Sequence, residues 1–80
     1  MVGYDDVYEM IVIDFQEALK KYNISIEKIR SRRREKILVD LRQRIASDLK
    51  AKGYSFPMIG DVMNRHHTSV IHLVKERLIS

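Results

Sequence analysis

The stretch from Ser55 to Arg77 constrains the fold of this chain more than any other. It contains two short segments with helical apolar spacing, and the polar residues 65–69, Arg-His-His-Thr-Ser, form the corner between them. Ser55 is a candidate N-cap, and Pro57 follows at a position where a helix has no partner for its backbone amide. Asn64 tolerates the left-handed backbone conformation that ends a helix. The stretch therefore predicts two helices joined by a tight turn.

The second of these helices begins with polar side chains. Helical spacing turns Val70 and Leu73 toward the interior, and Gly60 in the preceding helix allows the two helices to approach closely. The side chains left to point outward are His66, His67, Thr68, Ser69 and His72. Hydrogen-bonding groups in this place suit a helix that reads base edges in the major groove of DNA. The alternative is that Thr68 and Ser69 only cap the helix, stabilising it by about 1 kcal/mol each.

Composition excludes several classes of protein. Eighty residues make one domain, residues 1–80, whose core is too small for a complex catalytic cleft. The chain has no cysteine, so it can form neither a disulfide framework nor a thiolate zinc site. It has no apolar run long enough to cross a bilayer and no N-terminal signal sequence. We therefore expect a cytoplasmic protein without a membrane partner, associated with the nucleoid or, if phage-encoded, present in the host cytoplasm.

Charge is divided unevenly along the chain, although its total is +4. Residues 1–29 hold six acidic side chains against three lysines, a net charge of −3. Residues 30–80 hold twelve lysines and arginines against five acidic side chains, a net charge of +7. The densest basic stretch is the loop 30–34, with four arginines in five positions. Such a cluster repels itself unless an anion gathers it, which favours a polyanionic partner; the alternative is a solvated linker.

Further helices precede the turn. Asp5 or Asp6 can cap a first helix, and Ser25 can cap a one-turn helix. Residues 35–52 predict the longest helix of the second half, and no segment alternates in the manner of a strand. The fold class is therefore predicted to be all-α, a small domain of four to five helices with a helix-turn-helix at residues 55–79.

The N-terminal packing helix, residues 1–23, has a wide apolar stripe. Val7, Ile11 and Phe15 recur at helical steps along it. The residues that widen the stripe are Met10, Val12 and Ile13. The helix is expected to pack on the rest of the domain or on a second copy. Two alternatives to DNA binding alone follow: an adaptor that docks a protein partner on this stripe, and a dimeric regulator that pairs through it.

Residues 59–72 carry the most specific pattern in the chain. Ile-Gly at 59–60, followed by Arg-His-His-Thr-Ser-Val-Ile-His at 65–72, resembles the signature of the DNA-binding domain of the bacterial replication initiator DnaA. That signature has Ile-Gly, a short helix, then Gly-Arg-Asp-His-Thr-Thr-Val and a following His. Residues 55–57 resemble the family's Ser-Leu-Pro, and residues 39–43 resemble its Val-Glu-Ala-Arg-Gln. The resemblance covers residues 8–76.

The resemblance implies an all-α domain with a helix-turn-helix similar to that of the Trp repressor. It implies sequence-specific binding of double-stranded DNA, in the service of replication or transcription control. The signature helix would enter the major groove, and a basic-loop arginine would enter the adjacent minor groove.

Matching positions assign the expected DNA contacts. Those in the major groove are Arg65, His67, Thr68 and Ser69, with His66 reading base edges beside them. Those to phosphates are His72, Arg42 and Gln43. Phe56 and Pro57 are expected to bring the backbone of the first short helix against a DNA strand. Arg34 aligns best with the minor-groove arginine, and Arg32 or Arg33 takes that role if the loop shifts.

Two positions depart from the family signature. His66 stands where the family has Asp, which implies an altered sequence preference, because a neutral imidazole can donate or accept a hydrogen bond. Asn64 stands where the family has Gly, and it can adopt the same left-handed turn. No glycine-rich phosphate-binding loop is present, so we expect a free-standing domain of phage or mobile-element origin rather than an ATP-driven initiator.

The sequence does not predict catalysis, a metal or a cofactor. His66, His67 and His72 are separated by one, five and six residues, so no two of them have the i, i+4 spacing of a helical metal site. Ser69 lies beside histidines only in sequence, without a third group to orient a base. We therefore expect a protein that is not an enzyme, binds DNA and needs no cofactor.

Overall fold

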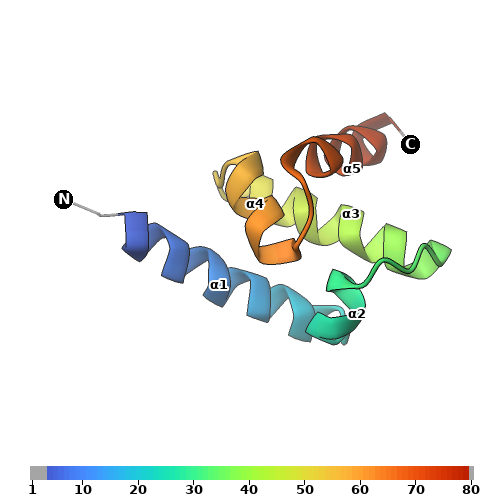
Figure 1. The fold of residues 1–80 in the computed structure, drawn as a ribbon, viewed down its shortest axis with the longest axis horizontal. Coiled ribbons are helices and arrows are strands. Elements are labelled where there is room, and N and C mark those ends of the chain that lie inside the picture. Colours follow the sequence, from blue (N-terminus) through green and yellow to red (C-terminus); the bar gives the residue numbers. More distant parts are fainter. Residues whose placement is uncertain (1–3, 80) are drawn as a thin grey trace.

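Five helices make up the part of the chain that the structure describes. The computed structural model describes residues 4–79 (Figure 1). Its helices are α1 (Tyr4–Lys21), α2 (Ile26–Arg30), α3 (Lys36–Ala51), α4 (Phe56–Met63) and α5 (His67–Ile79). No strand occurs among these described residues, and the predicted all-α domain with a helix-turn-helix is confirmed. None of the described helices is long and apolar enough to cross a membrane.

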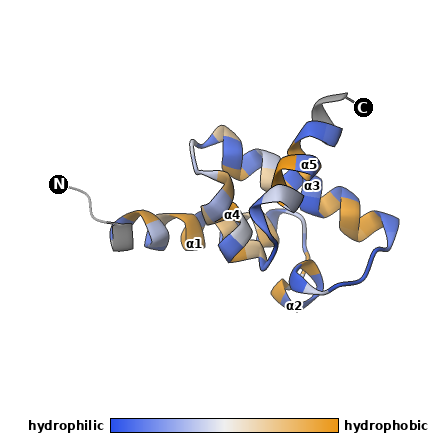
Figure 2. Ribbon diagram, turned by 45° about the horizontal axis from the view of Figure 1, so that its top comes forward, coloured by the Kyte–Doolittle hydropathy of each residue, from blue (hydrophilic) through white to orange (hydrophobic). Residues whose placement is uncertain are grey.

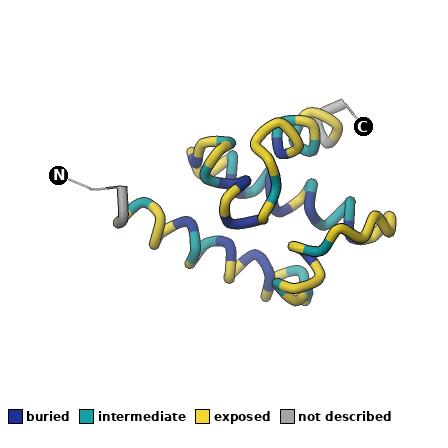
Figure 3. The backbone as a smooth tube through the Cα atoms, viewed as in Figure 1, coloured by how far each residue is buried: buried dark blue, intermediate teal, exposed yellow. Residues whose placement is uncertain are grey.

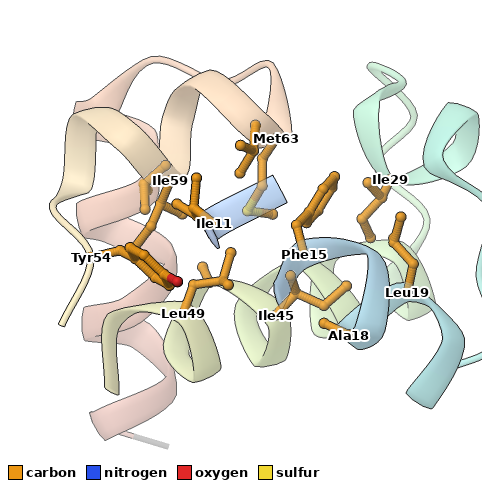
Figure 4. Close-up of a cluster of buried hydrophobic side chains, with 13 residues drawn as sticks. Ile11, Phe15, Ala18, Leu19, Ile29, Ile45, Leu49, Tyr54, Ile59 and Met63 are labelled. Carbon is orange, nitrogen blue, oxygen red and sulfur yellow. The ribbon is translucent and has the colours of Figure 1, made fainter. Parts of the chain in front are cut away.

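A single apolar core joins all five helices (Figure 4). Ile11 and Phe15 of α1 are 0% and 1% exposed, and they contact buried side chains from the other helices. The other core members are Ala18, Leu19, Ile29, Ile45, Ala46, Leu49, Tyr54, Ile59, Val62, Met63 and Val70. Burying one such large apolar side chain contributes about 1.5–3 kcal/mol. The predicted packing of the N-terminal helix on its own domain is therefore confirmed.

The outer side of α1 is different. Met10 and Ile13 are each 55% exposed, whereas Val12 is partly buried against the core. The N-terminal turns of α1 project beyond the other helices (Figure 2). Met10 and Ile13 thus widen the apolar stripe without being covered by the rest of the chain.

Local capping rules account for three of the helix ends. The Ser25 Oγ accepts a hydrogen bond from the Lys28 amide at 3.3 Å, and the Ser55 Oγ accepts one from the Met58 amide at 3.3 Å. Asn64 ends α4 in the left-handed conformation, with φ 55°. These predictions are confirmed. The N-cap predicted at Asp5 or Asp6 is wrong, because α1 already includes Tyr4 and both residues lie inside its first turn.

The turn between α4 and α5 requires a glycine at position 60. A Cβ there would lie 2.4 Å from the Arg65 carbonyl oxygen and 3.4 Å from the His67 amide nitrogen. The Arg65 amide donates to the Gly60 carbonyl at 2.8 Å, so the chain passes directly over this residue. The predicted close approach at Gly60 is confirmed.

The basic loop begins one residue later than the sequence indicates. α2 ends at Arg30, and this residue belongs to the helix rather than to the loop. Its Nε donates to the Val62 carbonyl at 2.8 Å, and its guanidinium lies 5.8 Å from the ring centre of Phe15. Arg30 therefore links α2 to α4. The irregular segment before α3 consists of residues 31–35, which we call the basic loop from here on.

Candidate nucleic-acid interface

The basic loop and α5 line one groove, which we call the basic groove. Its volume is about 640 Å³. Its lining residues are Arg32, Arg33, Arg34, Val39, Arg42, Arg65, Ser69, His72, Leu73 and Glu76. The loop and the first turn of α5 are among the exposed parts of the chain (Figure 3). Two segments more than thirty residues apart in sequence thus form one positively charged surface.

Polar side chains of α5 are presented to solvent beside this groove. His67, Thr68, Ser69 and His72 are all exposed, while Val70 is fully buried. Ser69, His72 and Glu76 share one helix face, because they are separated by three and four residues. Of the α5 residues that the sequence singles out, Ser69 and His72 line the groove, together with Glu76, which was not predicted, whereas His67 and Thr68 are exposed outside its lining.

His66 has a structural role that the sequence analysis missed. Its Nδ1 accepts a hydrogen bond from the Thr68 amide at 3.2 Å, in the manner of an N-cap for α5. Its ring lies 4.3 Å from the ring of His67, centre to centre. A carboxylate in the family's Asp position offers the same kind of acceptor. The Nδ1 of His66 is thus occupied within the protein, which leaves Nε2 as its outward ring nitrogen.

The three loop arginines differ in their surroundings. Arg33 forms an ion pair with Glu35, and both side chains are largely exposed. Arg32 and Arg34 are exposed, and neither has an ion-pair partner within residues 4–79. Burial lowers the pKa of the Arg65 guanidinium, and the positive charges of Arg32 and Arg34 lower it further. Such crowding of positive charge favours the binding of an anion.

Arg65 ties the turn before α5 to the basic loop. Its Nη1 lies 3.4 Å from the carbonyl oxygens of both Arg30 and Asn64, and its Nη2 donates to the Ser31 carbonyl. The side chain is half-buried, so part of it remains on the groove surface. Arg65 therefore fixes where α5 begins relative to the loop.

The predicted surface position of Arg42 is wrong. The residue is 4% exposed, and its guanidinium donates into the protein. Its Nε donates to the Ile29 carbonyl at 3.0 Å, its Nη1 to the Arg33 carbonyl at 2.7 Å and its Nη2 to the Ser31 carbonyl at 2.8 Å. Burial lowers its pKa, with a further contribution from the charge of Arg65. A side chain held in this way is not placed to bind phosphate.

The comparison with protein families identifies the family of the chain. Residues 15–76 match the model of the bacterial DnaA protein helix-turn-helix family. The chain belongs to this family. The matched region contains the basic loop, α3 and both helices of the helix-turn-helix, so every part of the basic groove lies within it. Neither the curated proteins nor the solved structures contain a match.

Membership of the DnaA helix-turn-helix family implies that the chain binds DNA. Residues 1–14, including most of the exposed side of α1, lie outside the matched region. The DNA-binding function therefore rests on the region from Phe15 onward, where the basic groove is built.

Three residues that the DnaA resemblance assigned to DNA are not among those that line the basic groove. Phe56 is half-buried, and the Lys50 ammonium lies 4.4 Å from its ring centre. Pro57 is exposed at the first turn of α4, at the end of that helix remote from the turn. The Gln43 side-chain amide donates to the Glu76 carboxylate at 3.1 Å, which links α3 to α5 at the rim of the groove.

Proposed function

We propose that this protein binds a short duplex DNA sequence specifically, with α5 in the major groove and the basic loop in the adjacent minor groove, and that it performs no chemistry. The observation that carries the proposal is the basic groove, in which loop arginines and polar α5 side chains face the same space. A domain that held these two elements on different sides could not grip both grooves of one duplex.

The two sides of the groove have different tasks. Arg32 and Arg34 have no carboxylate partner among the described residues, which suits phosphate neutralisation and insertion into a narrow minor groove. Arg34 is the leading minor-groove arginine, since Arg33 is drawn toward Glu35. His67, Thr68 and Ser69 are exposed on α5 and can hydrogen-bond to base edges in the major groove.

Selection of bound duplexes from a random pool tests this function. Recovered sequences should share a short box, and a fluorescence-anisotropy titration should show tighter binding to that box than to scrambled duplex. Each phosphate that the protein neutralises should contribute about −0.9 to the slope of log affinity against log salt concentration. Absence of binding to any duplex at low salt would contradict the proposal. With DNA as its partner, the protein is expected at the nucleoid.

The exposed side of α1 favours a second, compatible function as a dimeric regulator. Met10 and Ile13 are exposed on α1, and no described residue of α1 lines the basic groove. Pairing of two copies through α1 would therefore leave both grooves free for DNA. The adaptor hypothesis placed a protein partner on the stripe of Val7, Ile11 and Phe15. That surface is not available, because Ile11 and Phe15 are buried in the chain's own core.

A further inference from the structure

We infer that Arg42 is a positioning residue, which shapes the basic loop from inside the domain and fixes the distance between the minor-groove and major-groove contacts. The inference rests on the proposed function for its consequence on DNA, and on the hydrogen bonds of Arg42 for its structural part. It assigns Arg42 a role in specificity without any contact to the duplex.

The guanidinium of Arg42 donates to backbone carbonyls at the end of α2 and in the first half of the loop. At the end of α2 it reaches the carbonyl oxygens of Ile29 at 3.0 Å and Lys28 at 3.3 Å. Within the loop it reaches those of Ser31 at 2.8 Å and Arg33 at 2.7 Å. The Lys28 carbonyl also accepts from the Ser31 amide and hydroxyl, and the Ser31 carbonyl also accepts from Arg65, so Arg42 adds to these bonds and reaches the Ile29 and Arg33 carbonyls as well. A planar fork with five donors can serve all four at once, whereas a lysine ammonium cannot.

Ser31 is the point at which this scaffold reaches α5. Its carbonyl oxygen accepts from the Nη2 of Arg42 and also from the Nη2 of Arg65. Its Oγ donates to the Lys28 carbonyl at 2.7 Å and lies 3.3 Å from the Nη2 of Arg42. One backbone position is thus tied to α3 through Arg42 and to the start of α5 through Arg65.

The consequence is a fixed register between the two DNA-contacting elements. Arg32, Arg33 and Arg34 repel one another and would spread apart in a free loop. The hydrogen bonds from Arg42 to the carbonyls of residues 31 and 33 restrict the loop backbone, and this restricts the positions from which the three arginine side chains extend. Loss of this hold should let the loop contact move along the minor groove while α5 keeps its place in the major groove.

The first test needs no DNA and uses the charge-conserving variant Arg42→Lys. Arg44→Lys is the matched control, since Arg44 is an exposed arginine two residues along the same helix. Limited trypsin digestion, with the first cut located by mass spectrometry, measures opening of the arginine-rich loop. Losing two or more charged hydrogen bonds should accelerate cleavage at residues 32–34 at least about tenfold in Arg42→Lys. The rate in Arg44→Lys should equal that of the wild type. Equal loop cleavage in Arg42→Lys and wild type, or first cuts spread over the whole chain, overturns the inference.

The second test separates positioning from simple stability. Base pairs of the selected box are substituted one at a time, and affinity is measured for wild type, Arg34→Ala, Arg42→Lys and the double variant. Arg42→Lys should lose about tenfold discrimination at the positions where Arg34→Ala loses it, and none at the positions read by α5. The double variant should lose no more than Arg34→Ala alone, because Arg42 acts through the loop.

The outcomes distinguish the inference from the function on which it rests. Additive losses in the double variant, or a uniform loss over all base pairs, would show that Arg42 acts on phosphate or on overall stability, and the inference fails. If the wild type binds no duplex, the proposed function fails, while the trypsin comparison still decides whether Arg42 holds the loop.

Discussion

Asp14 and Tyr54 form a polar contact that holds α1 to the segment between α3 and α4. The Tyr54 hydroxyl donates to one carboxylate oxygen of Asp14, and the Lys52 ammonium lies 3.1 Å from the other. The Tyr54 hydrogen bond lowers the pKa of Asp14 below its usual value of 3.8, and Lys52 contributes further, against the opposing effect of burial. Burial and the neighbouring carboxylate raise the pKa of Tyr54 to about 12.

These shifts predict how stability depends on pH. Asp14 has a lowered pKa in the folded state, so its contribution is present above pH 3.8 and is lost as the pH falls below that value. Tyr54 has a raised pKa, so its contribution is complete below pH 10.0 and is lost as the pH rises from there toward about 12.

The variant Tyr54→Phe tests the predicted loss of stability at low pH and at high pH together. The variant should be less stable than wild type by about 1–2 kcal/mol at pH 7, because a hydrogen bond to a carboxylate is removed. The difference should narrow at both pH extremes, where the wild type loses the same contribution. Urea unfolding at pH 3, 7 and 11 measures it, with Tyr8→Phe, which alters a more exposed tyrosine of α1, as the control. A constant difference across the three pH values would contradict the assignment.

At the scale of the element, the turn between α4 and α5 has the least room for change. Gly60→Ala should destabilise the domain by about 2–3 kcal/mol, because the new methyl meets the Arg65 carbonyl oxygen, a backbone atom that cannot move alone. Asp61→Ala, at the exposed neighbouring position of α4, should change stability by less than about 0.5 kcal/mol. Thermal unfolding followed by circular dichroism compares the two. Similar midpoints for both variants would show that the turn relaxes more easily than the geometry indicates.

Substitutions in α5 and in the basic loop should change DNA binding in different ways. Thr68→Ala removes an exposed hydrogen-bonding group of α5 and should reduce discrimination between the selected box and its variants by about 1–3 kcal/mol. Its affinity for scrambled duplex should not change. Arg32→Ala should weaken binding to every duplex and reduce the salt slope by about 1. Anisotropy titrations over a salt series measure both quantities, and the same response from both variants would contradict this division of tasks.

Local rules made much of this architecture predictable, and tertiary packing decided the rest. The caps at Ser25, Ser55 and Asn64 depend only on neighbouring residues, so the sequence is sufficient to predict them. Arg42 lies four residues after Leu38 and three before Ile45, inside the buried stripe of α3. Its charge nevertheless predicted a position on the surface. Its burial is explained only by its hydrogen bonds to backbone carbonyls of α2 and the basic loop, which are distant in sequence. The cap that His66 provides is local, and it was missed because the imidazole was assigned only to base edges.

The molecule as a whole keeps its DNA-binding surface apart from its exposed apolar one. It measures 41 × 25 × 19 Å, and α1 extends along it with its N-terminal turns clear of the other helices (Figure 1). The basic groove is formed without α1, and Met10 and Ile13 face solvent on that helix. Such a patch is small beside the roughly 800 Å² per partner of a standard stable interface. Pairing through α1 in free solution should therefore be weak.

Pairing of two copies through α1 should become detectable on DNA, because two half-sites on one duplex raise the local concentration of the second copy. We expect cooperative binding to an inverted repeat of the selected box and simple binding to a single box. Ile13→Glu should abolish the cooperativity and leave single-box affinity unchanged, since it places charge in the paired surface and touches nothing in the basic groove. Gln16→Glu adds the same charge at another exposed position of α1 and should retain the cooperativity. Equal cooperativity in wild type and Ile13→Glu on the inverted repeat would assign the contact between copies to a surface other than α1.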